Sequence, residues 1–136
     1  PATQHIHPIK SAIRDVSNAF LRMGFDVHTS PDMTSEYANF DALNIPKWHP
    51  ARDMQDTFWL KDGSVLATQT PCMQNHLLKT KKLPFQSVVI GPAYRNEKID
   101  ATHEVMFDQV EGLVVGKDIN VNHLRYTLVE MLRQVF

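Results

Sequence analysis

The spacing of apolar residues predicts a helix near each end of the chain. Pro8 suits the first turn of a helix, and apolar residues follow it at helical spacing until Gly24, which favours a stop. A second amphipathic helix is expected to begin near Asn120 or Asn122. The residues expected to face the core are Ile9, Ile13, Val16 and Phe20 in the first helix, and Leu124, Leu128, Met131, Leu132 and Val135 in the last.

The sequence between these helices predicts mostly strands. Residues 32–56 lack a clear period, and a loop of about 20 residues within a compact domain is uncommon unless it is functional or packs on a partner. The order of the elements indicates an antiparallel α+β domain. The other expected elements are a strand over 25–29, a hairpin over 57–68 with Gly63 at a positive φ, a helix from Pro71 to about Thr80, and long strands over 86–94 and 105–115.

The second long strand carries an unusual row of side chains. Phe107, Gln109 and Glu111 are spaced by two, so they share one face of a sheet, and the residues between them point to the other face. An antiparallel neighbour could bring Arg95 and Glu97 close to this row. A strand used only for packing would alternate cleanly between apolar and polar residues, whereas this one places a ring, an amide and a carboxylate on one face. Spacing alone also allows an ordinary explanation, with Phe107 in the core and the polar residues in solvent.

Composition narrows the class of protein. A length of 136 residues fits one domain, and a net charge of −1 gives no electrostatic signature of nucleic-acid binding. The single cysteine, Cys72, excludes an internal disulfide and favours a reducing compartment such as the cytoplasm. No apolar run has the length of a membrane span, and the seven histidines show no zinc-like spacing, so no protein-ligated metal site is expected. The chain stops at Phe136 inside a predicted helix, which suggests a piece of a longer polypeptide.

Several separated strings match one family in the same order. They resemble the bacterial phenylalanyl-tRNA synthetase α subunit from about residue 7 to the last residue. The strings are Asn39-Phe-Asp-Ala-Leu-Asn-Ile-Pro, His49-Pro-Ala-Arg-Asp-Met-Gln-Asp-Thr-Phe-Trp, Thr68-Gln-Thr with Gln74, Tyr94-Arg-Asn-Glu, Asp100-Ala-Thr-His and Phe107-Asp-Gln-Val-Glu-Gly-Leu-Val-Val.

The resemblance implies a class II aminoacyl-tRNA synthetase fold, in which an antiparallel sheet is flanked by helices. Residues 1–136 would form a single partial catalytic domain. Motif 1 would cover about residues 8–31 and pack across a subunit interface, and motif 2 would cover about residues 86–115 and hold ATP. Motif 3 of the family lies further downstream and is absent, so the chain corresponds to the front half of the catalytic domain.

The resemblance also implies the reaction and its site. Phenylalanine would be activated by ATP with Mg²⁺ and transferred to tRNA, and motif 1 would contact a β subunit or a second copy. The substrate's own carboxylate is the nucleophile, so no protein base is needed for activation. Arg95 would bridge the α-phosphate and the amino-acid carboxylate. Glu97 would accept from the adenine amino group, His103 would lie near the phosphates, Phe107 would stack on adenine, Gln109 and Glu111 would receive the ammonium, and Gln69 and Gln74 would complete the polar rim.

The chain departs from the family pattern at three positions. Pro71 stands where the family usually has a serine, and Ala67 and Pro92 stand where it usually has arginines. These departures leave room for a second interpretation, a weakly active or inactive class II-like module that binds a partner subunit. A third interpretation is a related class II enzyme for another amino acid.

Overall fold

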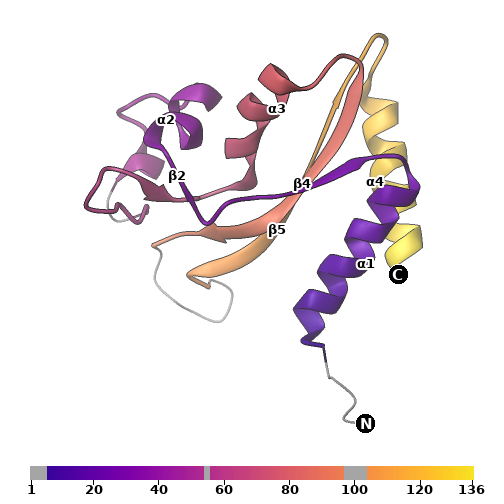
Figure 1. Cartoon of the computed structure of the whole chain (residues 1–136), viewed down its shortest axis with the longest axis horizontal. Coiled ribbons are helices and arrows are strands. Elements are labelled where there is room, and N and C mark those ends of the chain that lie inside the picture. The colour runs from indigo at the N-terminus through magenta and orange to yellow at the C-terminus, as the bar shows by residue number, and fades with distance from the viewer. Residues whose placement is uncertain (1–5, 54–55, 97–103) are drawn as a thin grey trace.

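The computed structural model describes residues 6–53, 56–96 and 104–136 (Figure 1). In this part of the chain a three-stranded sheet separates helices on its two faces, as expected of an α+β class. The strands are β1 (Asp26–Thr29), β4 (Phe85–Tyr94) and β5 (Met106–Val115), in the order β1-β4-β5. The helices α1 (Pro8–Arg22) and α4 (Val121–Val135) lie on one face, and α3 (Gln74–Thr80) lies on the other.

The sheet is mixed, which corrects the expectation of a purely antiparallel one. β4 and β5 are antiparallel, with Phe85 opposite Val115 and Tyr94 opposite Met106. β1 runs parallel to β4, with Val27 opposite Val88. A parallel pair needs a long crossover connection, and residues 30–84 supply it.

Two apolar cores follow from the alternation of β4 side chains. On one face Val88 and Ile90 pack with Phe20 and Phe25, whose rings meet edge to face with centroids 5.1 Å apart. On the other face Val89 packs with Phe85 of the same strand and with Leu77 of α3. Because both faces of β4 are covered, its central residues are almost entirely buried.

The two terminal helices form where the sequence predicted them. Pro8 opens α1, and Gly24, at φ +83°, follows its end. Ile13, Val16 and Phe20 reach the core, but Ile9 is exposed because α1 packs on the sheet only from Ile13 onwards.

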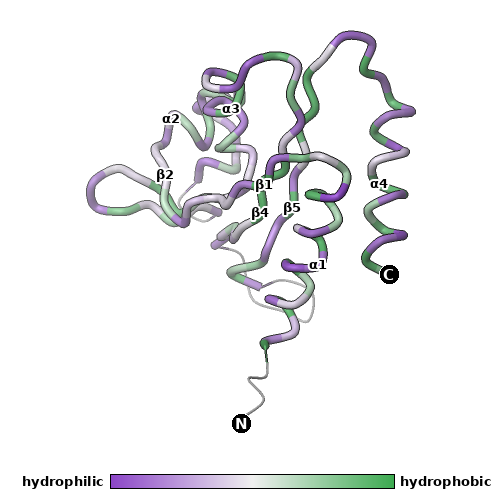
Figure 2. The backbone as a smooth tube through the Cα atoms, turned by 45° about the vertical axis from the view of Figure 1, so that its right-hand side comes forward, coloured by the Kyte–Doolittle hydropathy of each residue, from purple (hydrophilic) through white to green (hydrophobic). Residues whose placement is uncertain are grey.

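The expected buried stripe of α4 is wrong for most of its members. The helix begins where predicted, with Asn120 as its N-cap, and Met131 packs against the first core while Val135 is half-buried. The helix contacts α1, where Arg22 donates to Gln134 at 2.8 Å. This orientation turns the other apolar face of α4 outward, and apolar and polar segments alternate along its turns in Figure 2. The exposed members of the predicted stripe are Leu124, Leu128 and Leu132.

The segment between β1 and β4 contains more regular structure than its sequence indicated. Gly63 has the expected positive φ of +85°, but the predicted hairpin is reduced to a bridge between Trp59 and Val65. The predicted helix from Pro71 begins with a 3-10 turn, η3 (Thr70–Met73), before α3. The further short elements are β2 (Met33–Thr34), α2 (Glu36–Asn39), η1 (Asp41–Leu43), η2 (Pro50–Arg52) and β3 (Val65–Leu66), and β2 pairs with β3 in antiparallel fashion.

Candidate functional site

The predicted row of Phe107, Gln109 and Glu111, called here the β5 row, lies on the face of the sheet that η3 and α3 cover. Phe107, Gln109 and Glu111 are each half-buried, and the residues that alternate with them are exposed on the opposite face. Their partners on β4 include Gly91, opposite Gln109, and Ala93, opposite Phe107. These small partners take up little space above the strand, so the row is accessible beside η3.

Gly91 also allows β1 to end close to this row. A Cβ built on Gly91 would lie 2.8 Å from the Cβ of Ser30 and 3.1 Å from its backbone nitrogen. The Ser30 amide donates to the Ile90 carbonyl at 3.1 Å, so the backbone of Ser30 is held against the strand. A side chain at position 91 would therefore push this segment away.

Arg95 lies immediately after β4 and turns towards β5. Its backbone amide donates to the Val105 carbonyl at 2.9 Å. The guanidinium carbon lies 5.0 Å from the centroid of the Phe107 ring, within cation–π range. The predicted approach of Arg95 to Phe107 is thus confirmed, while the predicted residues Glu97 and His103 lie outside the described residues.

Glu111 accepts hydrogen bonds from two residues near the start of α3. Gln74 Nε2 donates to Glu111 Oε1, and Thr70 Oγ1 donates to Glu111 Oε2 at 3.2 Å. Burial raises the pKa of the Glu111 carboxyl above its usual range, whereas the hydrogen bonds from Gln74 and Thr70 oppose that rise. The backbone amide of Thr70 also donates to Gln109 Oε1 at 3.4 Å. Gln74, Gln109 and Glu111 are therefore brought together around η3.

Gln69 takes a different direction from these three residues. Its side-chain amide donates to the backbone carbonyl of Asn39 at 3.4 Å, at the end of α2. Asn39 is fully buried and exchanges two hydrogen bonds with Thr68, one to the hydroxyl at 2.9 Å and one from the backbone amide at 3.2 Å. The segment leading into η3 is thereby fixed to α2, and Gln69 faces α2.

A buried arginine holds the segment that carries α2. The Arg52 guanidinium forms ion pairs with Glu36 at 2.9 Å and Asp41 at 2.6 Å, and it donates to the Ile45 carbonyl. It also lies 4.9 Å from the centroid of the Phe40 ring. Since Glu36 belongs to α2, this cluster positions Asn39 and, through Asn39, the approach to η3.

Sequence reasoning assigned no role to Thr70 or Asn39. Thr70 stands in the Thr68-Gln-Thr string, but the string does not reveal that its hydroxyl reaches a strand residue 41 positions later. Asn39 opens another matched string, yet its partner lies 29 positions away. Both roles depend on long-range packing.

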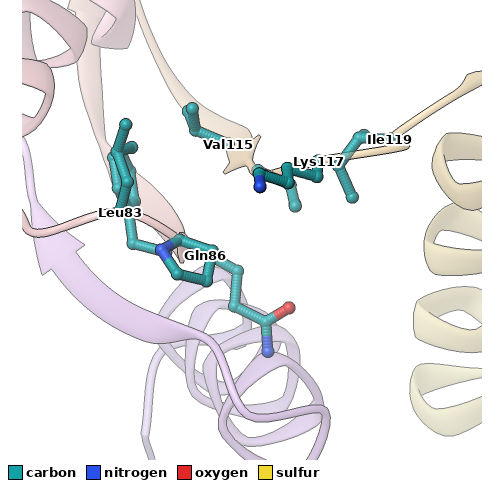
Figure 3. A pocket seen from close by; sticks show the side chains of 9 residues that line it. Leu83, Gln86, Val115, Lys117 and Ile119 are labelled. Carbon is teal, nitrogen blue, oxygen red and sulfur yellow. The ribbon is translucent and has the colours of Figure 1, made fainter.

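A cavity of about 930 Å³ lies away from this site, where β4 begins and β5 ends. Leu83, Gln86, Val115, Lys117 and Ile119 are among its lining residues, and Figure 3 shows them. Its walls are mainly apolar, and it carries none of the residues predicted to bind substrate. We therefore place the candidate site on the β5 row.

The described residues contain neither a cluster of metal-ligating side chains nor a helix that could span a membrane. Over residues 6–53, 56–96 and 104–136, no group of three or more His, Cys, Asp or Glu side chains is arranged to hold a metal ion. In the same part of the chain, no helix combines the length and apolar character needed to cross a bilayer.

Comparisons with known proteins identify a consistent set of relatives. The family model described as tRNA synthetases class II core domain (F) matches residues 1–136. The phenylalanine–tRNA ligase alpha subunit of Deinococcus radiodurans is 47% identical over 131 residues, which are 96% of this chain and 39% of that protein. The alpha subunit of Buchnera aphidicola subsp. Acyrthosiphon pisum is 45% identical over 136 residues, covering 98% of this chain and 41% of that protein. The chain thus spans about two fifths of the length of these relatives.

A solved structure supports the fold independently of close sequence identity. Pyrrolysyl-tRNA synthetase from Desulfitobacterium hafniense superposes with a TM-score of 0.74 at 21% identity. The match covers 98% of this chain and 48% of that one.

Proposed function

The chain belongs to the class II tRNA synthetase core-domain family, and on this basis we propose that it forms part of the catalytic core of a phenylalanine–tRNA ligase alpha subunit. The proposed reaction joins phenylalanine to ATP as an adenylate and then transfers the aminoacyl group to tRNA. In this proposal residues 1–136 are one partial catalytic domain. Motif 1 covers about residues 8–31 and motif 2 about residues 86–115.

The nucleotide half of the site is assigned to the end of β4 and the start of β5. Arg95 binds the α-phosphate and the amino-acid carboxylate, and Phe107 stacks on adenine. A guanidinium suits this position because it is permanently charged and can bind two oxygens at once. Glu97 and His103 complete the assignment, at the adenine amino group and near the phosphates. The closeness of Arg95 to Phe107 supports placing phosphate and base at neighbouring positions.

The amino-acid half of the site is assigned to the polar residues around η3. Gln109 and Glu111 receive the substrate ammonium, and Gln74 and Gln69 form the rim. A half-buried carboxylate is costly without a cation, and an ammonium group supplies one. The single observation that carries the proposal is this Glu111 carboxylate, held by Thr70 and Gln74 on the same strand face as Phe107.

Activation would need alignment and charge stabilisation more than proton transfer. The substrate carboxylate is already ionised at neutral pH and attacks the α-phosphate directly, with pyrophosphate leaving. Arg95 would neutralise charge that develops on the α-phosphate oxygens. Mg²⁺ would come with the ATP phosphates and supply further positive charge there. We assign no protein ligand to it.

The partners follow from the same proposal. tRNA and a β subunit would complete the enzyme in the cytoplasm, and motif 1 would supply a subunit interface. Exposed apolar side chains on α1, such as Leu21, support an interface at this helix.

A second candidate function is a weakly active or inactive module that binds a partner subunit. The proline at position 71 supports this second function, because η3 then offers no side-chain hydroxyl to a substrate where the family usually has a serine. At Ala67, another departure from the family pattern, the side chain is fully buried and carries no charge, in contrast to the arginine usual in the family.

The decisive experiment is ATP–pyrophosphate exchange with this chain, in the presence and absence of phenylalanine. We expect phenylalanine-dependent exchange that falls by about 100-fold or more in Arg95→Ala, by analogy with the loss of one oxyanion donor. Arg14→Ala, which removes an exposed arginine of α1, serves as the matched control and should exchange normally. Exchange that depends on another amino acid would redirect the substrate assignment. No exchange at high protein concentration would favour the non-catalytic module.

A further inference from the structure

Thr70 is a buried residue that contacts two members of the β5 row at once. Its hydroxyl donates to Glu111 and its backbone amide donates to Gln109. We propose that Thr70 is a positioning residue that fixes the Glu111 carboxylate and the Gln109 amide to receive a substrate ammonium group. This inference rests on the proposed function and extends it to a residue to which no role was assigned.

The burial of Thr70 makes its hydroxyl hard to replace. The residue is 0% exposed, so water does not reach the position that its hydroxyl occupies. A threonine hydroxyl has one proton to donate, and here it goes to Glu111 Oε2. Removing the hydroxyl would leave that oxygen without this donor, and a charged, half-buried acceptor loses more from this than an exposed one.

The arrangement leaves capacity for a ligand. An ionised carboxylate can accept about four hydrogen bonds. Thr70 and Gln74 use one on each oxygen, so they fix the orientation of the group without saturating it. An ammonium group has three protons to donate and fits the remaining capacity. Thr70 therefore acts on the substrate through Glu111 and need not touch it.

Among the described residues packed against Glu111, few carry a titratable or charged group. Val89 lies opposite on β4, and η3 and α3 contribute Thr70, Cys72 and Gln74. Cys72 is the titratable member of this set, and burial raises the pKa of its thiol, so it is uncharged at neutral pH. The ionisation of Glu111 is thus governed by burial and by its two donors.

The first test observes Glu111 directly, without reference to activity. The side-chain carboxyl carbon is followed by NMR against pH in the unmodified chain, Thr70→Ser and Thr70→Val, with Glu111→Gln used for assignment. Loss of the donor should raise the titration midpoint by about one pH unit in Thr70→Val, whereas Thr70→Ser should titrate like the unmodified chain. An unchanged midpoint in Thr70→Val would overturn the proposal.

The second test separates positioning from general distortion. Thr70→Val should raise the KM for phenylalanine in the exchange assay by about tenfold or more, with the KM for ATP unchanged, and Thr70→Ser should restore it. Thr57→Val is the matched control, because Thr57 is also buried and its hydroxyl donates to a backbone carbonyl, that of Ala51. This control should leave both KM values unchanged.

The outcomes distinguish the two proposals. Equal increases in both KM values, or an equal effect of Thr57→Val on phenylalanine, would indicate a purely structural role and overturn the assignment of Thr70. Absence of exchange in the unmodified chain would overturn the proposed function instead. The Glu111 titration would then still decide whether Thr70 holds this carboxylate.

Discussion

Replacing Arg52 by methionine is expected to destabilise the fold strongly, although the residue lies outside the β5 row. The Arg52 side chain is only 5% exposed, and its guanidinium contacts two carboxylates, one carbonyl and one ring. Methionine keeps an unbranched apolar stem, shorter than that of arginine, and removes the charge and the donors. Glu36 and Asp41 would then lose their shared cation, and the Ile45 carbonyl would lose a donor.

The magnitude follows from the unequal burial of the partners. Breaking a buried ion pair by removing one member costs about 3–5 kcal/mol. Glu36 and Asp41 are 41% and 39% exposed, so water can solvate them after the change. We therefore expect the lower end, about 3 kcal/mol, which corresponds to a fall in Tm of about 10 °C for a chain of this length. Arg52→Lys keeps one charge but cannot match the forked contacts, and it should cost less.

Urea unfolding at pH 7 measures this prediction. The unfolding midpoint should fall sharply in Arg52→Met, by an intermediate amount in Arg52→Lys, and hardly at all in Arg14→Met, whose arginine is exposed and contacts Asp15 and Ser11 at the surface. A loss of less than about 1 kcal/mol in Arg52→Met, below the usual cost of breaking a buried pair, would refute the reasoning. It would mean that contacts other than this cluster hold residues 36–52.

Two further predictions concern the sheet itself. Gly91→Ala should destabilise the fold by about 1–3 kcal/mol in urea unfolding, because the added Cβ would overlap Ser30. Gly112 has open space around it, so the control Gly112→Ala should change the unfolding free energy by no more than about 0.5 kcal/mol. Equal effects of the two substitutions would contradict the steric argument. Glu111→Gln should become more stable relative to the unmodified chain as pH rises above the ordinary carboxyl value of 4.5, because the raised pKa of Glu111 means that its ionised form is disfavoured in the folded state. The measurement is the difference in unfolding free energy between Glu111→Gln and the unmodified chain, taken at pH 4 and at pH 8. The same difference at both pH values would argue against this prediction.

The long elements could be predicted from sequence because their signals are local. Helical spacing after Pro8 and strand spacing around Gln109 each require only a few neighbouring residues. The capping role of Asn120 is similarly local. Periodicity also located the apolar face of α4, but it could not tell which side of that helix would meet α1. The outward position of Leu128 is decided by the packing of α4 on α1.

Residues 32–56 show where local signals are insufficient. Short elements such as α2 are too small to be stable by propensity alone. They are held by contacts such as that between Arg52 and Glu36, which are 16 positions apart. A pattern search over neighbouring residues does not detect such pairs.

The candidate site divides in the same way. Strand spacing predicted that Phe107, Gln109 and Glu111 share a face, and the position of Arg95 after β4 predicted its approach to Phe107. Neither feature indicated that Thr70 would bind this row. The parallel pairing of β1 also escaped the prediction, because the direction of a strand depends on the whole crossover that precedes its partner.

The position of Arg95 has a consequence for how a nucleotide would enter. On the proposed assignment, adenine stacks on a ring whose face already carries a guanidinium. Entry of the base is then an exchange of one flat partner for another, and the released guanidinium becomes available to the phosphates. Stacking would then contribute to the affinity for ATP only through the difference between the two stacked arrangements, so truncating Phe107 would weaken nucleotide binding by less than a full base–aromatic contact of about 1–3 kcal/mol.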